Sequence, residues 1–415
     1  MNPRPERHAA VSRTTLVLGL ALGLAGSACS SRDIVAASPG GDAGGGGGSG
    51  ASFCEGSGPP ILLGDGITIS EGDGNPDSVC TGEIAVRAFE RALCTCEGYA
   101  TSTMLQTDSF DSVVGPYAPG GASGDVGVNG ELRTNAVVTV SGGLAVAGAA
   151  GAVLLADLHV TGDLEIGGAL GNGVAVTSGG NVRVAGNVNL ANLDVTGTLT
   201  VPETQTISGG VTAGTTVRAP VTVAPPCACD NDDLVDLEAF IAAHVTDNQD
   251  AAIGLAPDAL TDYDGAVSLD LPCGIYYVGP VRGNGALTLR VSGRVALLVD
   301  GDLSLTAPFT VELVNDDAEL DLMVGGLLSS GEAVVIGRAD HPARTRVYIG
   351  GEGTINLAGD SQLAANLYAP RASVALSGGA TVFGSLFVRR LDQSAPIAIH
   401  YDVDVRRADV GCPVL

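Results

Sequence analysis

The sequence predicts an all-β protein, a parallel β-helix or solenoid, and three observations support this prediction. A phrase of the form [Val/Leu]-small-Gly-x-[Leu/Val]-x-[Val/Leu/Ile] recurs along the chain, and its apolar residues lie two apart, which is the period of a β-strand. Several copies start about 20 residues apart, the length of one solenoid turn. The chain contains 61 glycines and only 4% aromatic residues, so its core must consist of small aliphatic side chains.

The repeats fall into two stretches, residues 128–226 and 273–403. The copies are Val140–Val146, Val160–Ile166, Val184–Leu190, Val195–Val201, Val291–Leu297 and Val299–Leu305, with weaker ones at Leu357–Leu363 and Leu376–Val382. One turn cannot bury its inward face alone, whereas turns stacked about 4.8 Å apart form a continuous core. A β-sandwich would also give short strands at this spacing. The absence of Trp, the glycine content and the repeated phrase favour the solenoid.

Two segments lack the strand pattern. Residues 54–127 contain four cysteines and a predicted helix that ends at Gly98. The apolar face of this helix would hold Ile84, Ala88, Phe89, Ala92, Leu93 and Cys96. Because the open end of a β-helix needs a cover, we expect this Cys-rich helical region to form a small N-terminal cap. Residues 227–272 contain a second Cys-rich stretch and a short predicted helix, and we expect a helical insertion between two parts of one solenoid. Residues 404–415 would form a C-terminal tail.

Residues 1–28 have the pattern of a bacterial lipoprotein signal peptide. Three arginines precede an apolar run, Leu16–Ala28, which is too short to span a bilayer and ends in small residues before Cys29. We expect acylation of Cys29, and the alternative is an ordinary secretory peptide cleaved near Ala28. Residues 29–53 contain a Gly-rich stretch typical of a flexible tether. The expected product is held to the lipid bilayer by its acylated N-terminus, at the outer membrane or surface of a Gram-negative cell.

The charge of the chain excludes one class of partner. The formal net charge is −26, and none of the 20 basic residues is a lysine. Nucleic-acid-binding proteins need clustered basic side chains to neutralise phosphates, so we expect no nucleic-acid partner.

The remaining eight cysteines form two groups along the sequence. The first group is Cys54, Cys80, Cys94 and Cys96, and the second is Cys227, Cys229, Cys273 and Cys412. Each group contains one Cys-x-Cys motif, whose two members would close a disulfide with poor geometry. In an oxidising compartment we therefore expect each motif to pair with the lone cysteines of its own group. A metal site is the alternative, although Cys-x-Cys lacks the usual spacing of zinc ligands.

The phrase His400-Tyr401-Asp402 is the most similar to an enzyme site, because His and Asp are two members of a hydrolase triad. The chain has no Gly-x-Ser-x-Gly motif to supply the nucleophile. In a strand, His400 and Asp402 share one face, and we expect a structural hydrogen-bonded pair there. We identify no catalytic residue and expect that the protein is not an enzyme.

Asp317, Glu319 and Asp321 alternate with apolar residues, which would place three carboxylates on one outer strand face. A solvated surface is the default interpretation of such a cluster. Hard cations also bind clustered carboxylate oxygens, so weak Ca²⁺ binding at these three residues is the alternative that we retain. We expect no other cofactor.

Several phrases in the second half carry a resemblance to a known family. They are Gly274–Tyr277, Ala296–Leu303, Arg346–Gly351, Ala365–Pro370, Gly384–Phe387 and His400–Asp402. Over roughly residues 274–403 they resemble an uncharacterised family of bacterial surface lipoproteins with a right-handed β-helix. The last stretch is similar to the tail domain of some PilX-related pilus-assembly proteins, and the Gly-containing turns resemble those of bactofilin-type polymer-forming proteins. The family has no established catalytic residues, so the resemblance implies a fold but no site.

Three functions follow as hypotheses. The first is a structural, adhesive or scaffolding role at the cell surface, with a surface protein or a polysaccharide as partner. The second is a pilus- or secretion-associated accessory protein. The third is a polysaccharide-active enzyme, which a lateral cleft lined by convergent acids and an arginine would favour.

Overall fold

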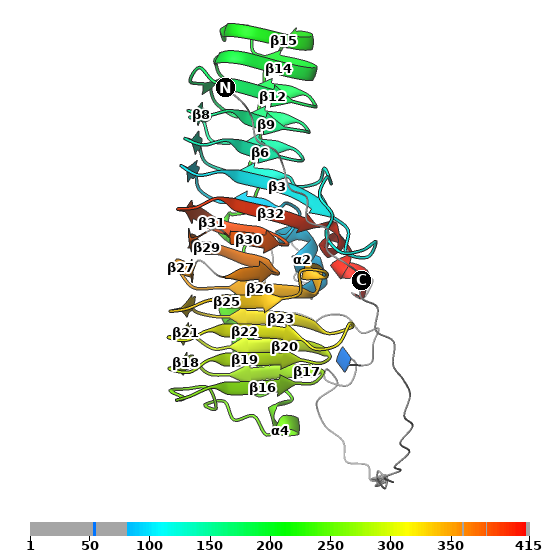
Figure 1. Cartoon of the computed structure of the whole chain (residues 1–415), viewed down its shortest axis with the longest axis vertical. Coiled ribbons are helices and arrows are strands. Elements are labelled where there is room, and N and C mark those ends of the chain that lie inside the picture. The colour runs from blue at the N-terminus through cyan, green and yellow to red at the C-terminus, as the bar shows by residue number, and fades with distance from the viewer. Residues whose placement is uncertain (1–52, 55–80, 359–360, 379, 412–415) are drawn as a thin grey trace, which may run out of the picture. The chain divides into compact units, whose positions relative to one another are not determined.

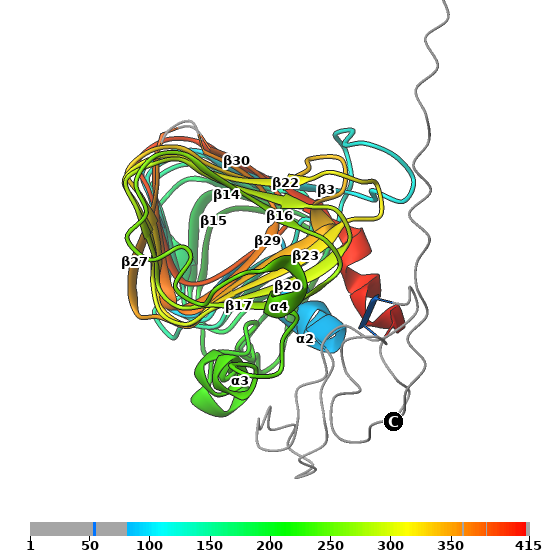
Figure 2. The same ribbon diagram turned by 90° about the horizontal axis from the view of Figure 1, so that it is seen from below.

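The computed structural model describes residues 53–54, 81–358, 361–378 and 380–411, which all belong to one compact unit, Gly47–Leu415. Its strands pair in parallel and stack as the turns of a three-sided solenoid, seen from the side in Figure 1 and along its axis in Figure 2. The predicted all-β parallel β-helix is therefore confirmed. No helix in the described part of the chain is long and apolar enough to cross a membrane.

We call the three sides A, B and C, in the order in which the chain follows them. Side A contains β1 (Leu93–Thr95), β4 (Val126–Val128), β7 (Leu144–Val146), β10 (Leu164–Ile166), β13 (Val182–Val184), β17 (Gly274–Val278), β20 (Arg294–Val299), β23 (Glu319–Val324) and β26 (Thr345–Ile349). Side B contains β2 (Tyr99–Thr101), β5 (Leu132–Thr134), β8 (Ala152–Leu154), β11 (Leu170–Gly171), β18 (Val281–Gly283), β21 (Leu303–Leu305), β24 (Leu328–Ser330) and β27 (Gly353–Ala358).

Side C contains β3 (Leu105–Phe110), β6 (Val138–Val140), β9 (Leu158–Val160), β12 (Ala175–Ser178), β16 (Val267–Leu271), β19 (Leu287–Val291), β22 (Phe309–Leu313), β25 (Val334–Gly337), β28 (Gln362–Ala364), β30 (Ala380–Phe383) and β32 (Ile397–Asp402). Longer strands continue around corners from one side to the next: β14 (Val188–Val201), β15 (Ile207–Arg218), β29 (Asn366–Ser377) and β31 (Leu386–Gln393).

The order of the turns in space differs from their order in the chain. The chain enters the stack in its middle, at β1–β3, and builds turn by turn to β15 at one end (Figure 1). Residues 219–266, which we call the return segment, then lead to β16 at the other end. From β16 the turns build back to the middle, where β31 pairs with β1 and β32 pairs with β3. The two halves thus form one continuous stack, and we call their boundary the seam.

The position predicted for the Cys-rich region is wrong for residues 81–127, the part of it that the structure describes continuously, because these residues lie in the middle of the stack and do not cover an end. Strands β1 and β3 each pair with a strand on both sides, and the helix α2 (Thr81–Ala88) lies beside the middle of the stack. The helix is also shorter than predicted, since Leu93 already belongs to β1. All residues of β1 are buried, so its sequence shows no alternation and cannot be told from a buried helical face by pattern alone.

The return segment contains η1 (Asn231–Asp233), α3 (Leu237–Ala243) and α4 (Asp250–Ile253). The predicted short helix is α3, which buries Leu237, Phe240 and Ile241. It begins at Asp236, whose side chain accepts a hydrogen bond from the Ala239 amide at 3.0 Å, as is usual for a helix N-cap. The remaining short helices are η2 (Pro342–Arg344) and η3 (Val403–Gly411).

The repeated phrase has a structural cause at the corner between sides C and A. Its glycines stack from turn to turn, and the Gly162 amide donates to the Gly142 carbonyl at 2.8 Å while the Gly180 amide donates to Gly162 at 3.0 Å. A Cβ atom at Gly162 would lie 2.8 Å from the carbonyl of Gly142, which is too close for any other residue. The flanking Val and Leu side chains point inward and form the buried core.

Candidate functional site at the seam

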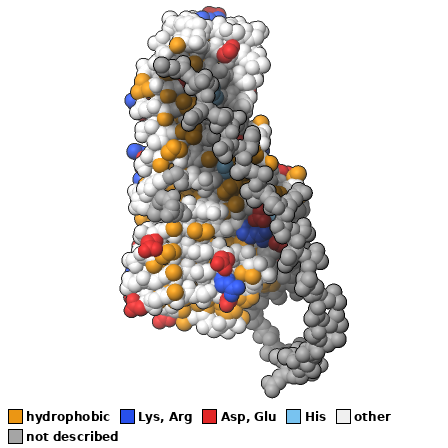
Figure 3. Space-filling view, in the orientation of Figure 1, with side chains coloured by type: hydrophobic (Ala, Val, Ile, Leu, Met, Phe, Trp, Pro, Cys, Tyr) orange, Lys and Arg blue, Asp and Glu red, His pale blue; other side chains and the backbone are white. Residues whose placement is uncertain are grey.

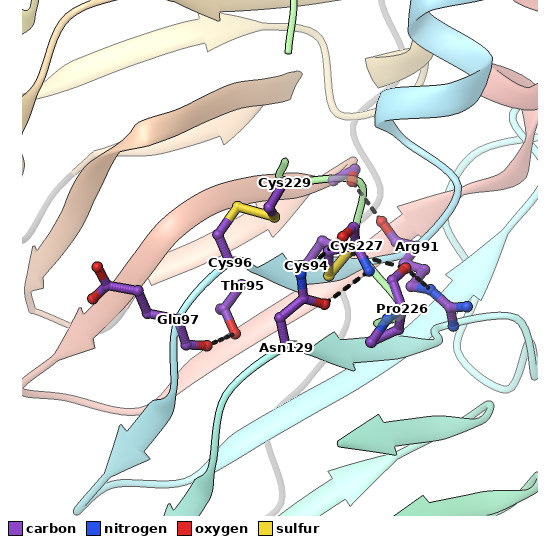
Figure 4. The surroundings of a disulfide bond; sticks show 10 residues. Arg91, Cys94, Thr95, Cys96, Glu97, Asn129, Pro226, Cys227 and Cys229 are labelled. Carbon is purple, nitrogen blue, oxygen red and sulfur yellow. Dashed lines mark hydrogen bonds between the residues drawn. A yellow bond between two sulfur atoms is a disulfide. The ribbon is translucent and has the colours of Figure 1, made fainter. Parts of the chain in front are cut away.

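On side A, two neighbouring disulfides join the seam to the return segment (Figure 4). Cys94 pairs with Cys227 and Cys96 pairs with Cys229, with Cα–Cα distances of 5.8 and 5.5 Å. Residues i and i+2 of an extended chain point to the same side, so two parallel Cys-x-Cys motifs can form both bonds at once.

The predicted pairing within each cysteine group is therefore wrong, although the predicted disulfides themselves are confirmed for six cysteines. The third bond, Cys54–Cys273, also joins the two groups. Poor closure within a Cys-x-Cys motif does not exclude pairing with a second motif that lies alongside, which the sequence-based argument did not consider. Cys80 and Cys412 lie outside the described residues, as does Cys29, the predicted acylation site.

The segment around Cys227 is held to the solenoid by more than its sulfur atoms. The Asn129 side chain donates to the Cys227 carbonyl at 2.8 Å and accepts from the Cys227 amide at 3.0 Å, in the manner of a strand neighbour (Figure 4). Arg91 Nε donates to the Pro226 carbonyl at 3.2 Å. A Cβ atom at Gly127 would lie 3.0 Å from Cys227 Sγ, so a larger residue at Gly127 would push the return segment away.

On side C, a buried polar cluster joins β3, in the first half of the solenoid, to β32, in the second half. His400 Nδ1 lies 2.6 Å from Asp108 Oδ1, and the Tyr117 hydroxyl donates to Asp108 Oδ2 at 2.7 Å. The His400 ring lies 4.0 Å from the Tyr117 ring and 5.1 Å from the Phe383 ring, measured between centroids. Burial, together with the Asp108 carboxylate, raises the pKa of Tyr117, so this hydroxyl stays protonated and donates.

The predicted pair of His400 with Asp402 does not form. Asp402 is fully buried and instead accepts backbone N–H groups from Ser112 at 3.0 Å, Asp404 at 3.1 Å and Ala343 at 3.3 Å. Burial raises the pKa of Asp402, and these hydrogen bonds oppose the rise. In the described part of the chain, no Ser, Thr or Cys side chain is hydrogen-bonded to His400.

The carboxylates proposed to bind calcium occupy a different environment from the one predicted. Asp321 is on the outward face of β23, but it is buried beneath other elements, and Arg346 Nε donates to it at 2.6 Å. Arg346 also pairs with Glu319. Asp317 precedes the strand and is exposed. The calcium prediction is therefore wrong, because an arginine takes the place of the cation, and the described residues contain no His, Cys, Asp and Glu cluster suited to a metal.

Electrostatic interactions keep both Arg346 and Glu319 charged. Burial alone would lower the pKa of Arg346, but Asp321 and Glu319 outweigh it and raise the pKa. Burial alone would likewise raise the pKa of Glu319, but Arg346 and Arg294 hold it below its usual value. Sequence reasoning missed Arg346, although Arg346 follows Asp321 by 25 residues, one turn of the solenoid in this region.

On side B, the ladder of strands is interrupted at the seam. Residues Arg390–Gln393 of β31 pair with β29, and β2 pairs with β5, but the described strands show no pairing between β31 and β2. A groove of about 570 Å³ lies at this interruption, and we call it the lateral groove. Its lining residues are Ala100, Thr101, Ser102, Arg133, Asn135, Ala375, Leu376, Ser377, Asp392, Gln393 and Ser394.

The charges of the lateral groove are already paired. Arg133 binds Glu131 at 2.7 Å, and Asp392 binds Arg390 at 2.7 Å. Gln393 is buried beneath the groove, where it donates to Thr103 Oγ1 at 2.7 Å. The groove therefore offers hydroxyl and amide groups for hydrogen bonding to a polar ligand. It does not bring several acids together, as proton transfer to a glycosidic bond would need.

Comparison with known protein families finds a match for part of the chain. Residues 228–408 match a family described as a domain of unknown function, DUF7305. This match covers most of the return segment and the second half of the solenoid, up to the seam. The curated proteins and the solved structures give no match.

Proposed function

We propose that the chain is an extracytoplasmic β-solenoid lipoprotein, anchored to the membrane through Cys29, with a structural, adhesive or scaffolding role at the cell surface. The observation that carries this proposal is the set of three disulfides between segments far apart in sequence. Such bonds persist in oxidising compartments and are rare in the cytosol.

The surface of the solenoid is consistent with a structural role. On the face shown in Figure 3, charged side chains are few; some lie singly, and others form small clusters of basic and acidic groups. On side C, for example, Arg290 pairs with Asp270 at 2.7 Å and with Glu312 at 3.7 Å across three neighbouring strands. The resemblance of residues 274–403 to surface lipoproteins also supports this location. That resemblance leaves a pilus-associated accessory as an alternative, which neighbouring pilus-assembly genes would support.

The test compares cells that express the wild-type chain with cells that express Cys29→Ser. We expect fatty-acid labelling and membrane retention to be lost in the variant, together with any cell–cell or cell–surface adhesion that the wild type supports. Protease treatment of intact cells measures surface exposure in both. Unchanged labelling of the variant, or reduced cysteines in the isolated wild-type protein, would contradict the proposal.

A second candidate function, a polysaccharide-active enzyme, rests on one observation, the lateral groove with Arg133 and a single acid, Asp392, in its lining. The purified chain would be screened for turnover of acidic and neutral polysaccharides. Loss of a measured turnover in Asp392→Asn, with turnover retained in the exposed control Asp194→Asn, would support the enzyme and contradict the purely structural role.

A further inference from the structure

The two ends of the solenoid differ in how their strand edges are covered. At the β16 end, the return segment covers two of the three sides. The Gln249 amide donates to the Ile275 carbonyl at 2.7 Å beside β17, and the Arg282 amide of β18 donates to Leu260 at 3.0 Å. On the third side, β16 carries the exposed charge of Asp270.

The β15 end has no such cover. Strand β15 pairs with β14 on all three sides, with a register shift at each of the two corners between them, and within the described part of the chain it pairs with no other strand. Figure 1 shows β15 as the last turn of the stack. The outer edge of β15 therefore presents backbone N–H and C=O groups that no described strand satisfies.

Most of β15 lacks the side chains that protect an edge. Natural edge strands usually carry charges or proline that prevent pairing with another chain, but residues 207–217 contain neither. The one charge of β15 is Arg218 at its last position, where it is in register with Val201 and donates to the carbonyls of Pro202 and Gln205 in its own chain. The inward residues Ile207, Val211 and Ala213 are only half-buried, whereas the β14 residues in register with them are buried. The end turn thus combines an unpaired edge with incompletely covered apolar side chains, where repeat proteins usually place a polar capping repeat.

We propose that the β15 turn binds the β15 turn of a second copy of this chain, which gives a closed two-fold dimer. The net charge of −26 makes two copies repel over most of their surface, but β15 contains no acid, and the nearest one in sequence is Glu203 in the preceding corner. A second copy supplies a turn of the same three-sided outline, with its own uncovered edge and half-buried apolar residues. Two-fold symmetry pairs the strands antiparallel and uses the β15 end of both copies, and the return segment blocks two of the three sides at the β16 end, so the product is a dimer and not a fibre. This inference does not depend on the proposed function.

The test measures the mass of the purified chain in solution by sedimentation equilibrium between about 1 and 100 µM, the range that covers weak to moderate association. The main variant is Thr216→Lys. Thr216 is exposed and in register with the inward-facing Leu199, so a lysine there places two like charges at the centre of the proposed interface without disturbing the core. The control is Leu155→Lys, which adds the same charge at a site that is 57% exposed on the side of the stack.

We expect a wild-type dimer, a Leu155→Lys dimer, and a dissociation constant at least about tenfold higher for Thr216→Lys. A lysine lowers the net negative charge of either variant, so weakening confined to Thr216→Lys cannot come from general repulsion. Hydrogen exchange of the wild type gives a second readout that needs no variant, because amides of residues 207–218 should gain protection as the concentration rises. A wild-type monomer throughout this range, or β15 amides protected equally at all concentrations by the chain's own residues, would overturn the proposal.

Discussion

Asp108 and His400, which are 292 residues apart in the chain, are register partners on two parallel strands, and their side chains meet at 2.6 Å. Asp108 belongs to β3, in the first turn of the solenoid, and His400 belongs to β32, in the last. The contact therefore joins the turn in which the chain begins the stack to the turn in which it ends it. Because both side chains are buried, the seam is held by a polar contact as well as by the backbone ladder.

Replacing Asp108 by Asn should weaken the seam. An amide keeps the shape of the carboxylate but removes the negative charge, and it cannot accept hydrogen bonds from both His400 and Tyr117. We expect a loss of about 1–3 kcal/mol in the free energy of unfolding, measured by chemical denaturation. Asp194→Asn, at an exposed position, should change this free energy by less than about 0.5 kcal/mol. Equal effects of the two substitutions would show that the contact does not stabilise the seam.

Removing the two neighbouring disulfides should have strongly non-additive effects. Cys94–Cys227 and Cys96–Cys229 close loops of the same sequence separation, 133 residues, and the two loops nearly coincide, so either bond alone supplies most of the loop-closure constraint on the unfolded chain. We expect loss of one pair to serine to cost about 1–2 kcal/mol and loss of both to cost about 5 kcal/mol. Denaturation without reductant measures these costs. If the two costs simply add, the bonds stabilise the fold by local contacts and not by loop closure.

The repeated phrase allowed the solenoid to be predicted, because stacked turns need glycine at positions such as Gly162 and an inward Val or Leu on either side. The order of the turns could not be predicted, since every turn offers the same apolar column to its neighbours. Leu93 pairs with Leu386 on one side and Val126 on the other, and nothing local in the sequence distinguishes these partners.

The contacts of the candidate site residues depend on the order of the turns in the stack. The partner of Cys94 is fixed only once the return segment is known to cross the seam. Likewise, Asp321 is on the outward face that its alternation predicts, but its burial and its pairing with Arg346 depend on which turns and helices lie against this face.

Removing Arg346 alone should lower the free energy of unfolding more than removing Arg346 and Asp321 together. Arg346→Met leaves the Asp321 carboxylate buried without its partner, and we expect a loss of about 3–5 kcal/mol in the free energy of unfolding. Adding Asp321→Leu to this variant removes the buried charge and should recover at least about 1 kcal/mol. Chemical denaturation of the two variants measures the difference. A double variant less stable than Arg346→Met alone would contradict the buried ion pair.

Protonation of Glu319 should lower the stability of the protein in acid. Its pKa is lowered in the folded protein because Arg346 and Arg294 outweigh the effect of burial, so its stabilising contribution is complete above the ordinary value of 4.5 and is lost as the pH falls through the lower folded value. We expect Glu319→Gln to lose about 1–3 kcal/mol at pH 7. The gap between wild type and variant should narrow below pH 4.5, because the wild type then loses the same carboxylate by protonation. Urea denaturation from pH 7 to pH 3 measures this gap, with Glu332→Gln, at an exposed position, as the control that shows no such narrowing. A gap that stays constant across this range would mean that the Glu319 side chain stabilises the fold by packing alone and not through its charge.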